Sequence, residues 1–135
     1  MSYDIYLAAE TCDKCGRGGG IEVRYDSPTY NYGRMIREAD RLAGGEGCSF
    51  EAVNGVAAEV AIRWFRAVLA EVRGNEAKIR ALAPDNGWGT YEDLDKIFTD
   101  YIRLCEENPK AVWETLGSRA RGRRCSGGWV CGEPE

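Results

Sequence analysis

The sequence predicts an α+β domain with a small antiparallel sheet, made of two N-terminal strands and one C-terminal strand and covered by three to four helices. Apolar and polar residues alternate near both ends of the chain, as in half-buried strands, whereas apolar residues recur at helical spacing in between. The chain has 135 residues, of which 44% are hydrophobic and 30% charged. This length suits one such domain and is too short for two.

Strands are predicted at residues 2–8, 20–25 and 111–116. In the second strand, Val23 and Tyr25 should share one face. A glycine-rich turn between the first two strands favours a hairpin, and Pro28 ends the second strand because proline cannot donate to a sheet.

Helical spacing runs through residues 31–43, 55–73 and 76–82, and from Thr90 to Asn108. The first helix should end at Gly44-Gly45. The residues expected to cap the longer helices are Asn31, Asn54 and Thr90.

The helix over 55–73 has a narrow polar stripe and apolar residues around most of its circumference, so it should be the central helix. We therefore expect Val60, Trp64 and Val68 to be almost fully buried.

Composition excludes several functions. The chain has no histidine, so histidine-based catalysis and histidine-ligated metal sites are excluded. Its formal net charge of −4 argues against attraction of the whole surface to nucleic acid or anionic membranes. The N-terminus lacks a signal-peptide pattern, and no window approaches the apolar length of a membrane span. We expect a cytoplasmic, non-membrane protein whose six cysteines begin as thiols.

A Cys-x-x-Cys-Gly knuckle at Cys12 and Cys15 can hold a metal through its thiolates. Cys125 and Cys131 are the best candidates for the remaining ligands of a structural zinc, although their spacing is wider than usual. A Cys125–Cys131 disulfide and free thiols remain alternatives. Cys105 lies on the apolar side of its helix and should be buried.

The sequence divides into a single domain over residues 1–116 and a C-terminal tail over 117–135. The tail contains one basic cluster with a nearby tryptophan, a combination that suits phosphate contact and base stacking. Its arginines are Arg119, Arg121, Arg123 and Arg124.

Trp88 stands between two glycines in a predicted loop. Tryptophan is usually mostly buried, so we expect its ring to fold back over the helices as a hydrophobic plug. If they are exposed, Tyr30, Tyr32 and Trp88 are instead suited to anchor a protein interface.

Three segments carry a family resemblance: the start Ser2-Tyr3-Asp4-Ile5-Tyr6-Leu7, the stretch Thr29-Tyr30-Asn31-Tyr32 before Met35, and Asn86-Gly87-Trp88-Gly89-Thr90-Tyr91-Glu92. In this order they resemble a family of small uncharacterised proteins of actinobacterial phages, prophages and their hosts. The resemblance covers roughly residues 1–8, 28–42 and 80–115 and implies a phage-encoded accessory protein, but no functional residue.

The sequence therefore favours a non-enzymatic phage-type accessory protein that binds and modulates a host or phage protein. The alternative is a zinc-stabilised nucleic-acid-binding module that uses the tail arginines.

Overall fold

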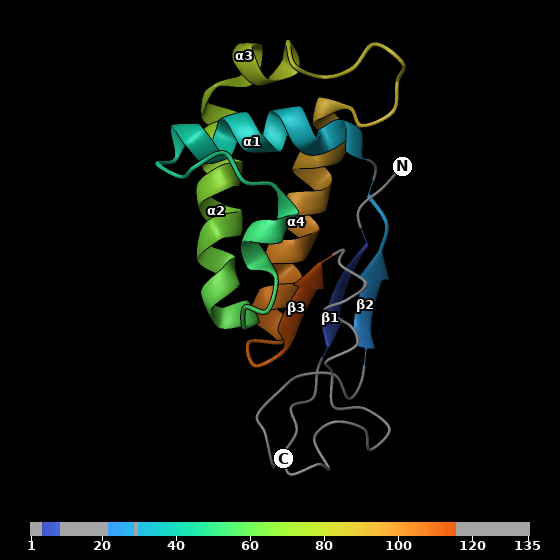
Figure 1. Cartoon of the computed structure of the whole chain (residues 1–135), viewed down its shortest axis with the longest axis vertical. Helices are drawn as coiled ribbons and strands as arrows, with labels where there is room; N and C mark the ends of the chain where they lie inside the picture. Colours follow the sequence, from blue (N-terminus) through green and yellow to red (C-terminus); the bar gives the residue numbers. More distant parts are fainter. Residues whose placement is uncertain (1–3, 9–21, 29, 116–135) are drawn as a thin grey trace.

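The structure is a computed structural model that describes residues 4–8, 22–28 and 30–115 (Figure 1). It confirms the predicted α+β class. Its elements in chain order are the strands β1 (Ile5–Ala8) and β2 (Glu22–Asp26), the 3-10 helix η1 (Tyr30–Tyr32), helix α1 (Gly33–Leu42), the 3-10 helix η2 (Phe50–Val53), the helices α2 (Ala58–Gly74), α3 (Glu76–Arg80) and α4 (Tyr91–Glu107), and strand β3 (Val112–Thr115).

The strands form one antiparallel sheet in the order β2-β1-β3, so the first strand is the central one. Figure 1 shows the α-helices together on one side of this sheet. The alternation along β1 turns Ile5 and Leu7 toward the helices, where both are buried. Tyr6 takes the other face and pairs its ring with that of Tyr25 on β2, with ring centroids 4.9 Å apart.

A β-bulge changes the predicted faces of β2. The register shifts between Leu7 and Ala8, which leaves Val23 as the additional residue on the opposing strand. Val23 consequently packs against the core, whereas Tyr25 points outward and is 46% exposed. The expectation that Val23 and Tyr25 share a face was wrong, because strict alternation does not hold across a bulge.

The outer edge of β3 is closed by the segment that precedes α2. Gly55 N donates to Trp113 O at 2.7 Å, and Trp113 N donates to Val56 O at 3.0 Å. Asn54 Oδ1 accepts a 3.0 Å bond from Thr115 N in the same region. Asn54 thus extends the pairing of β3 and does not cap α2, which begins later, after Ala57.

Phe65 of α2 lies at the centre of an aromatic core. Its ring meets those of Phe98, Tyr101 and Trp113 at centroid distances of 5.5, 5.7 and 5.3 Å, all close to edge-on. Each such pair contributes about 0.5–1.5 kcal/mol beyond the area it buries. Cys105 is buried beside this cluster, as predicted, and its Sγ accepts a 3.3 Å bond from Trp113 Nε1.

Helix α2 is central but less enclosed than its sequence indicated. Val68 is fully buried as predicted, whereas Val60 is 51% exposed and Trp64 is half-buried. The exposed face of α2 includes Val60, Ala67 and Ala70 as well as the polar residues. It is therefore wider than the polar residues alone predicted.

The other predicted helix boundaries had mixed outcomes. Thr90 caps α4 as predicted, because its Oγ1 accepts a 3.1 Å bond from Asp93 N. Gly44, with φ of 101°, follows the end of α1 and confirms the predicted stop. Asn31 is not the N-cap of α1, since the turn of η1 places Tyr32 there without a side-chain bond.

Among the described helices, none has the length and apolar character to cross a membrane.

Candidate functional site

The predicted metal and nucleic-acid sites fall on parts of the chain outside the described residues. Those positions are Cys12, Cys15, Cys125 and Cys131 for zinc and Arg119, Arg121, Arg123 and Arg124 for nucleic acid. Within residues 4–8, 22–28 and 30–115, no group of three or more acidic or cysteine side chains is placed to hold a metal ion. The zinc site stays a prediction.

The predicted aromatic anchors separate into different environments. Tyr32 is 6% exposed and belongs to the hydrophobic core, so its ring is not available to a partner. Trp88 is 69% exposed, and the hydrophobic-plug interpretation was therefore wrong. The backbone of Tyr30 lies in η1, but its side chain is outside the described part of the structure.

The loop around Trp88 holds its indole away from the core. Gly87 and Gly89 have φ of 81° and 85°, a region that costs other residues about 1–2 kcal/mol. Between them, Trp88 N donates a 2.9 Å bond to Asn86 Oδ1, which closes a local turn. This backbone sets the direction of the side chain, and the ring remains in solvent.

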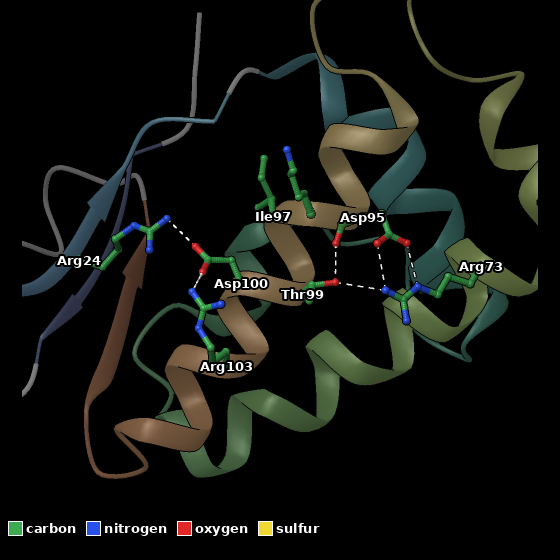
Figure 2. Close-up of a pocket in the computed structure, with 8 residues that line it drawn as sticks. Arg24, Arg73, Asp95, Ile97, Thr99, Asp100 and Arg103 are labelled. Carbon is green, nitrogen blue, oxygen red and sulfur yellow. Dashed lines mark hydrogen bonds and ion pairs between the residues drawn. The ribbon is translucent and has the colours of Figure 1, made fainter.

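A cleft of about 590 Å³ crosses the solvent side of α4 (Figure 2). Arg24 of β2 forms one wall, and Arg73 near the end of α2 forms the opposite wall. Helix α4 supplies the floor between them. The α4 residues that line the cleft are Asp95, Lys96, Ile97, Thr99, Asp100 and Arg103.

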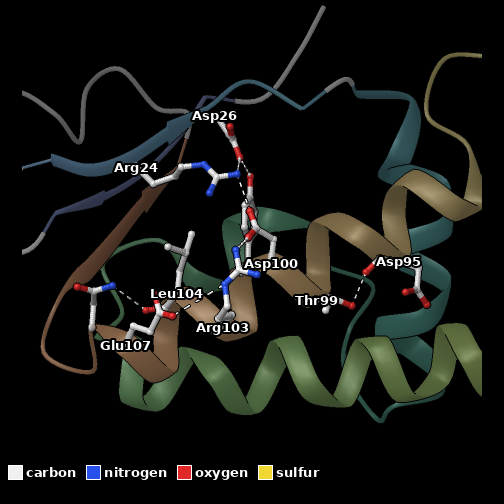
Figure 3. A network of polar contacts seen from close by, with 10 residues as sticks. Arg24, Asp26, Asp95, Thr99, Asp100, Arg103, Leu104 and Glu107 are labelled. Carbon is white, nitrogen blue, oxygen red and sulfur yellow. Dashed lines mark hydrogen bonds and ion pairs between the residues drawn. The ribbon is translucent and has the colours of Figure 1, made fainter.

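An ion-pair network ties β2 to α4 at one end of the cleft (Figure 3). Arg24 Nη2 lies 2.6 Å from Asp100 Oδ2 and 3.2 Å from Asp26 Oδ2. Arg103 binds the other oxygen of Asp100. Tyr101 completes the network by donating its hydroxyl to Asp26 Oδ2 at 2.8 Å. Burial raises the pKa of Tyr101, with the Asp26 charge adding to the effect, so the phenol stays a neutral donor.

A second network ties α2 to α4 at the other end (Figure 2). Arg73 donates two hydrogen bonds to Asp95, from Nε to Oδ2 at 2.8 Å and from Nη2 to Oδ1 at 2.9 Å. Its Nη2 also reaches Thr99 Oγ1 at 3.2 Å. The bond from Arg73 lowers the pKa of Asp95, which is consequently ionised at neutral pH.

This arrangement suits binding better than proton transfer. Asp95 and Asp100 are both paired with arginines, so neither is poised as a general acid or base. Lys96 is exposed and, among the described residues, has no ion-pair partner. The three arginines of the cleft are all paired with carboxylates, namely those of Asp26, Asp95, Asp100 and Glu107.

Sequence reasoning missed this cleft because its residues come from three separate elements. Arg24 gave no distinct signal, because Glu22, Arg24 and Asp26 alternate with apolar residues as on the polar face of a half-buried strand. The pairing of Arg24 with Leu7 of β1 places Arg24 on the helix-facing side of the sheet, where it binds Asp100 of α4. This register between the strands is not visible in the amino-acid order alone.

Comparisons with protein-family models, curated proteins and solved structures found no match to this chain.

Proposed function

We propose that this protein is a non-enzymatic accessory factor that binds and modulates another protein, and that the loop 85–89 with Trp88 forms the centre of the contact surface. The observation that carries this proposal is the exposure of Trp88 on a loop of defined backbone conformation. Tryptophan is the side-chain type most enriched among residues that dominate binding energy.

The backbone of this loop is already held in one conformation before a partner binds. A large ring leaves water on binding, and each buried square ångström contributes about 25 cal/mol. Asn86 and the positive φ angles of Gly87 and Gly89 already fix the turn, so less conformational entropy is lost on binding. A partner with an apolar pocket would receive the indole with little rearrangement.

The paired state of the cleft carboxylates supports a binding role over a catalytic one. The proposed setting is a phage or prophage protein acting in the bacterial cytoplasm, and it rests on the resemblance of the three segments named above. The modulated partner is a host or phage protein.

The proposal is tested by affinity capture from the bacterial host with the full chain and three variants. Trp88→Ala removes the proposed anchor. Val60→Ala is the matched control, because Val60 is another large apolar side chain exposed on the surface. The third variant replaces the four tail arginines with alanine. A partner retained by the control and by the arginine variant, but lost with Trp88→Ala, is the expected result.

Two outcomes contradict the proposal. One is a partner that binds the Trp88→Ala variant as well as the unchanged chain. The other is salt-sensitive binding of DNA or RNA that disappears with the arginine variant, with a slope of about −0.9 in log K against log salt for each phosphate contact on duplex DNA. That second outcome supports the zinc-stabilised nucleic-acid module.

A further inference from the structure

Helix α2 turns one face to solvent, away from the sides that pack against α1 and α4 (Figure 1). Ala67 lies in the middle of this face. Val60 and Gly74 stand seven residues before and after it, close to two helical turns away, so the three residues form one line along the helix. Val60 is 51% exposed, and a Cβ at Gly74 would meet nothing within 4 Å. The centre of this face is therefore apolar and uncovered by the described part of the chain.

Residues three or four positions from Ala67 border this central line on both sides. They are Arg63, Trp64, Ala70 and Glu71. Trp64 is half-buried, and its Nε1 donates a 2.8 Å bond to Asp40 Oδ1, so its ring forms a fixed edge of the surface. We call the surface formed by residues 60, 63, 64, 67, 70, 71 and 74 the open face of α2.

Two opposite charges stand at equal distances from the middle of the open face. Arg63 lies four residues before Ala67, and Glu71 lies four residues after it. Arg63 is exposed and has no ion-pair partner among the described residues. Glu71 Oε1 accepts a 3.0 Å bond from Asn75 Nδ2, and the second oxygen of Glu71 has no ion pair within the described residues. Both side chains can therefore form a further pair.

This arrangement makes the open face complementary to itself. In an antiparallel pair of helices related by a two-fold axis at Ala67, each residue meets the one equally far on the other side of that axis. Arg63 of one copy then faces Glu71 of the second copy. Size is matched in the same way, because Val60 faces Gly74 and Trp64 faces Ala70.

The charges also decide between the two possible orientations of the helices. A parallel two-fold pair places Arg63 beside Arg63 and Glu71 beside Glu71, so like charges repel in both places. The antiparallel pair forms two opposite-charge contacts instead. Small side chains at Ala67, Ala70 and Gly74 let the two helix axes approach to about 8 Å, the close end of the usual range.

We propose that a second copy of this chain binds the open face of α2 and forms an antiparallel two-fold dimer centred on Ala67. The inference goes beyond the proposed function, and no residue of the loop 85–89 takes part in the contact. A contact between two single helices is smaller than the standard interface of about 800 Å² per partner. The dimer should consequently be weak and form at high micromolar concentration.

The test is sedimentation velocity of the full chain, in reducing buffer so that cysteines cannot cross-link the copies. The protein concentration is varied from about 10 µM to about 1 mM, which covers the dissociation constants expected of a weak complex. A weight-average sedimentation coefficient that rises with concentration toward the value of a dimer is the expected result.

Charge reversal identifies the contact. Each Arg63–Glu71 contact occurs twice in a two-fold dimer, so Arg63→Glu should weaken the dimer by about five- to thirtyfold, the effect of losing two exposed ion pairs. Glu71→Arg should have a similar effect. The double variant Arg63→Glu, Glu71→Arg restores both opposite-charge contacts and should recover the original affinity.

Lys96→Glu is the matched control, because it makes the same change in net charge as Arg63→Glu at an exposed position on α4. It should leave self-association unchanged. Urea denaturation of each variant at low protein concentration shows whether the monomer remains folded. At the similarly low concentration of affinity capture the dimer is dissociated, so Val60→Ala stays a valid control for Trp88→Ala.

Three results overturn the proposal. The first is a sedimentation coefficient that does not rise up to the highest concentration. The second is self-association that Arg63→Glu weakens no more than Lys96→Glu does. The third is a double variant that associates no more tightly than the folded single variants, because the antiparallel pairing requires the reversed charges to meet again.

Discussion

Trp64 Nε1 donates a 2.8 Å hydrogen bond to Asp40 Oδ1 and thereby joins the middle of α2 to the last turns of α1. Asp40 is only 5% exposed. Its other oxygen accepts bonds from Gly47 N at 2.9 Å and Cys48 N at 2.8 Å. One carboxylate therefore holds two helices and the loop between α1 and η2, and it places the polar edge of Trp64 at the rim of the core.

The Asp40 contacts should make stability depend on pH in acid. Burial by itself raises the pKa of Asp40, but the bonds from Cys48 N, Trp64 and Gly47 N outweigh it and lower the pKa below its ordinary 3.8. The stabilisation is complete above that value. It is lost as pH falls from about 4 through the lower pKa of the folded state, because the unfolded chain then binds more protons.

We expect Asp40→Asn to lower the free energy of unfolding at pH 7 by about 1.5–3 kcal/mol, the range for hydrogen bonds to charged groups. The variant should also lose less stability than the unchanged chain between pH 4 and pH 2. Urea denaturation at a series of pH values measures both effects. Asp85→Asn, a change at an exposed carboxyl group, should leave both nearly unchanged. Equal effects of the two variants would contradict the role of Asp40.

Two glycine-to-alanine changes should have opposite effects on stability. A Cβ at Gly45 would lie 2.4–2.6 Å from atoms of the Asp40 carboxyl group, which its hydrogen bonds hold in place. We expect Gly45→Ala to cost about 1–3 kcal/mol, as other overpacking changes do. A Cβ at Gly74 meets nothing within 4 Å at the end of α2, so Gly74→Ala should stabilise by about 0.4–1 kcal/mol. Denaturant midpoints measure both changes, and a neutral Gly45→Ala variant would show that the loop can move aside.

The ion pairs of Asp100 should protect β2 against local opening. Asp100→Asn weakens the contacts with Arg24 and Arg103, whereas the Arg24–Asp26 pair remains. We expect faster amide hydrogen exchange in β2 and little change in α2. Asp95→Asn is the matched control, because Asp95 ties α4 to α2 through Arg73. If both variants accelerate exchange in β2 equally, Asp100 does not fasten that strand.

The four-cysteine zinc site is tested by elemental analysis of the purified full chain. One zinc ion per chain is the expected result, with loss of the metal in a Cys12→Ser variant because structural zinc needs its complete ligand set. Cys105→Ser is the control, since Cys105 is buried beside Trp113 and is not one of the predicted ligands. A metal-free protein would contradict the prediction.

Periodicity in the sequence was sufficient for the fold class and for most elements. Leu7 and Val68 occupy the core positions that their spacing predicted, and the Thr90 cap was visible because it depends on residues three apart. The predictions that Asn54 caps a helix and that Val60 is buried were wrong. Both depend on what neighbouring elements do, namely the pairing of β3 with residues 55–57 and the incomplete cover over α2.

By itself, the sequence determined an α+β domain without histidine-based chemistry, because composition and local periodicity suffice for those conclusions. Only the tertiary structure decided that Tyr32 is buried and Trp88 exposed, since two similar aromatic side chains differ there in what packs over them. The tertiary structure also decided that a cleft forms between β2, α2 and α4. Arg24 and Asp100 are far apart in the chain, and the register of β2 on β1 and the packing of α4 beside the sheet bring their charges within 2.6 Å.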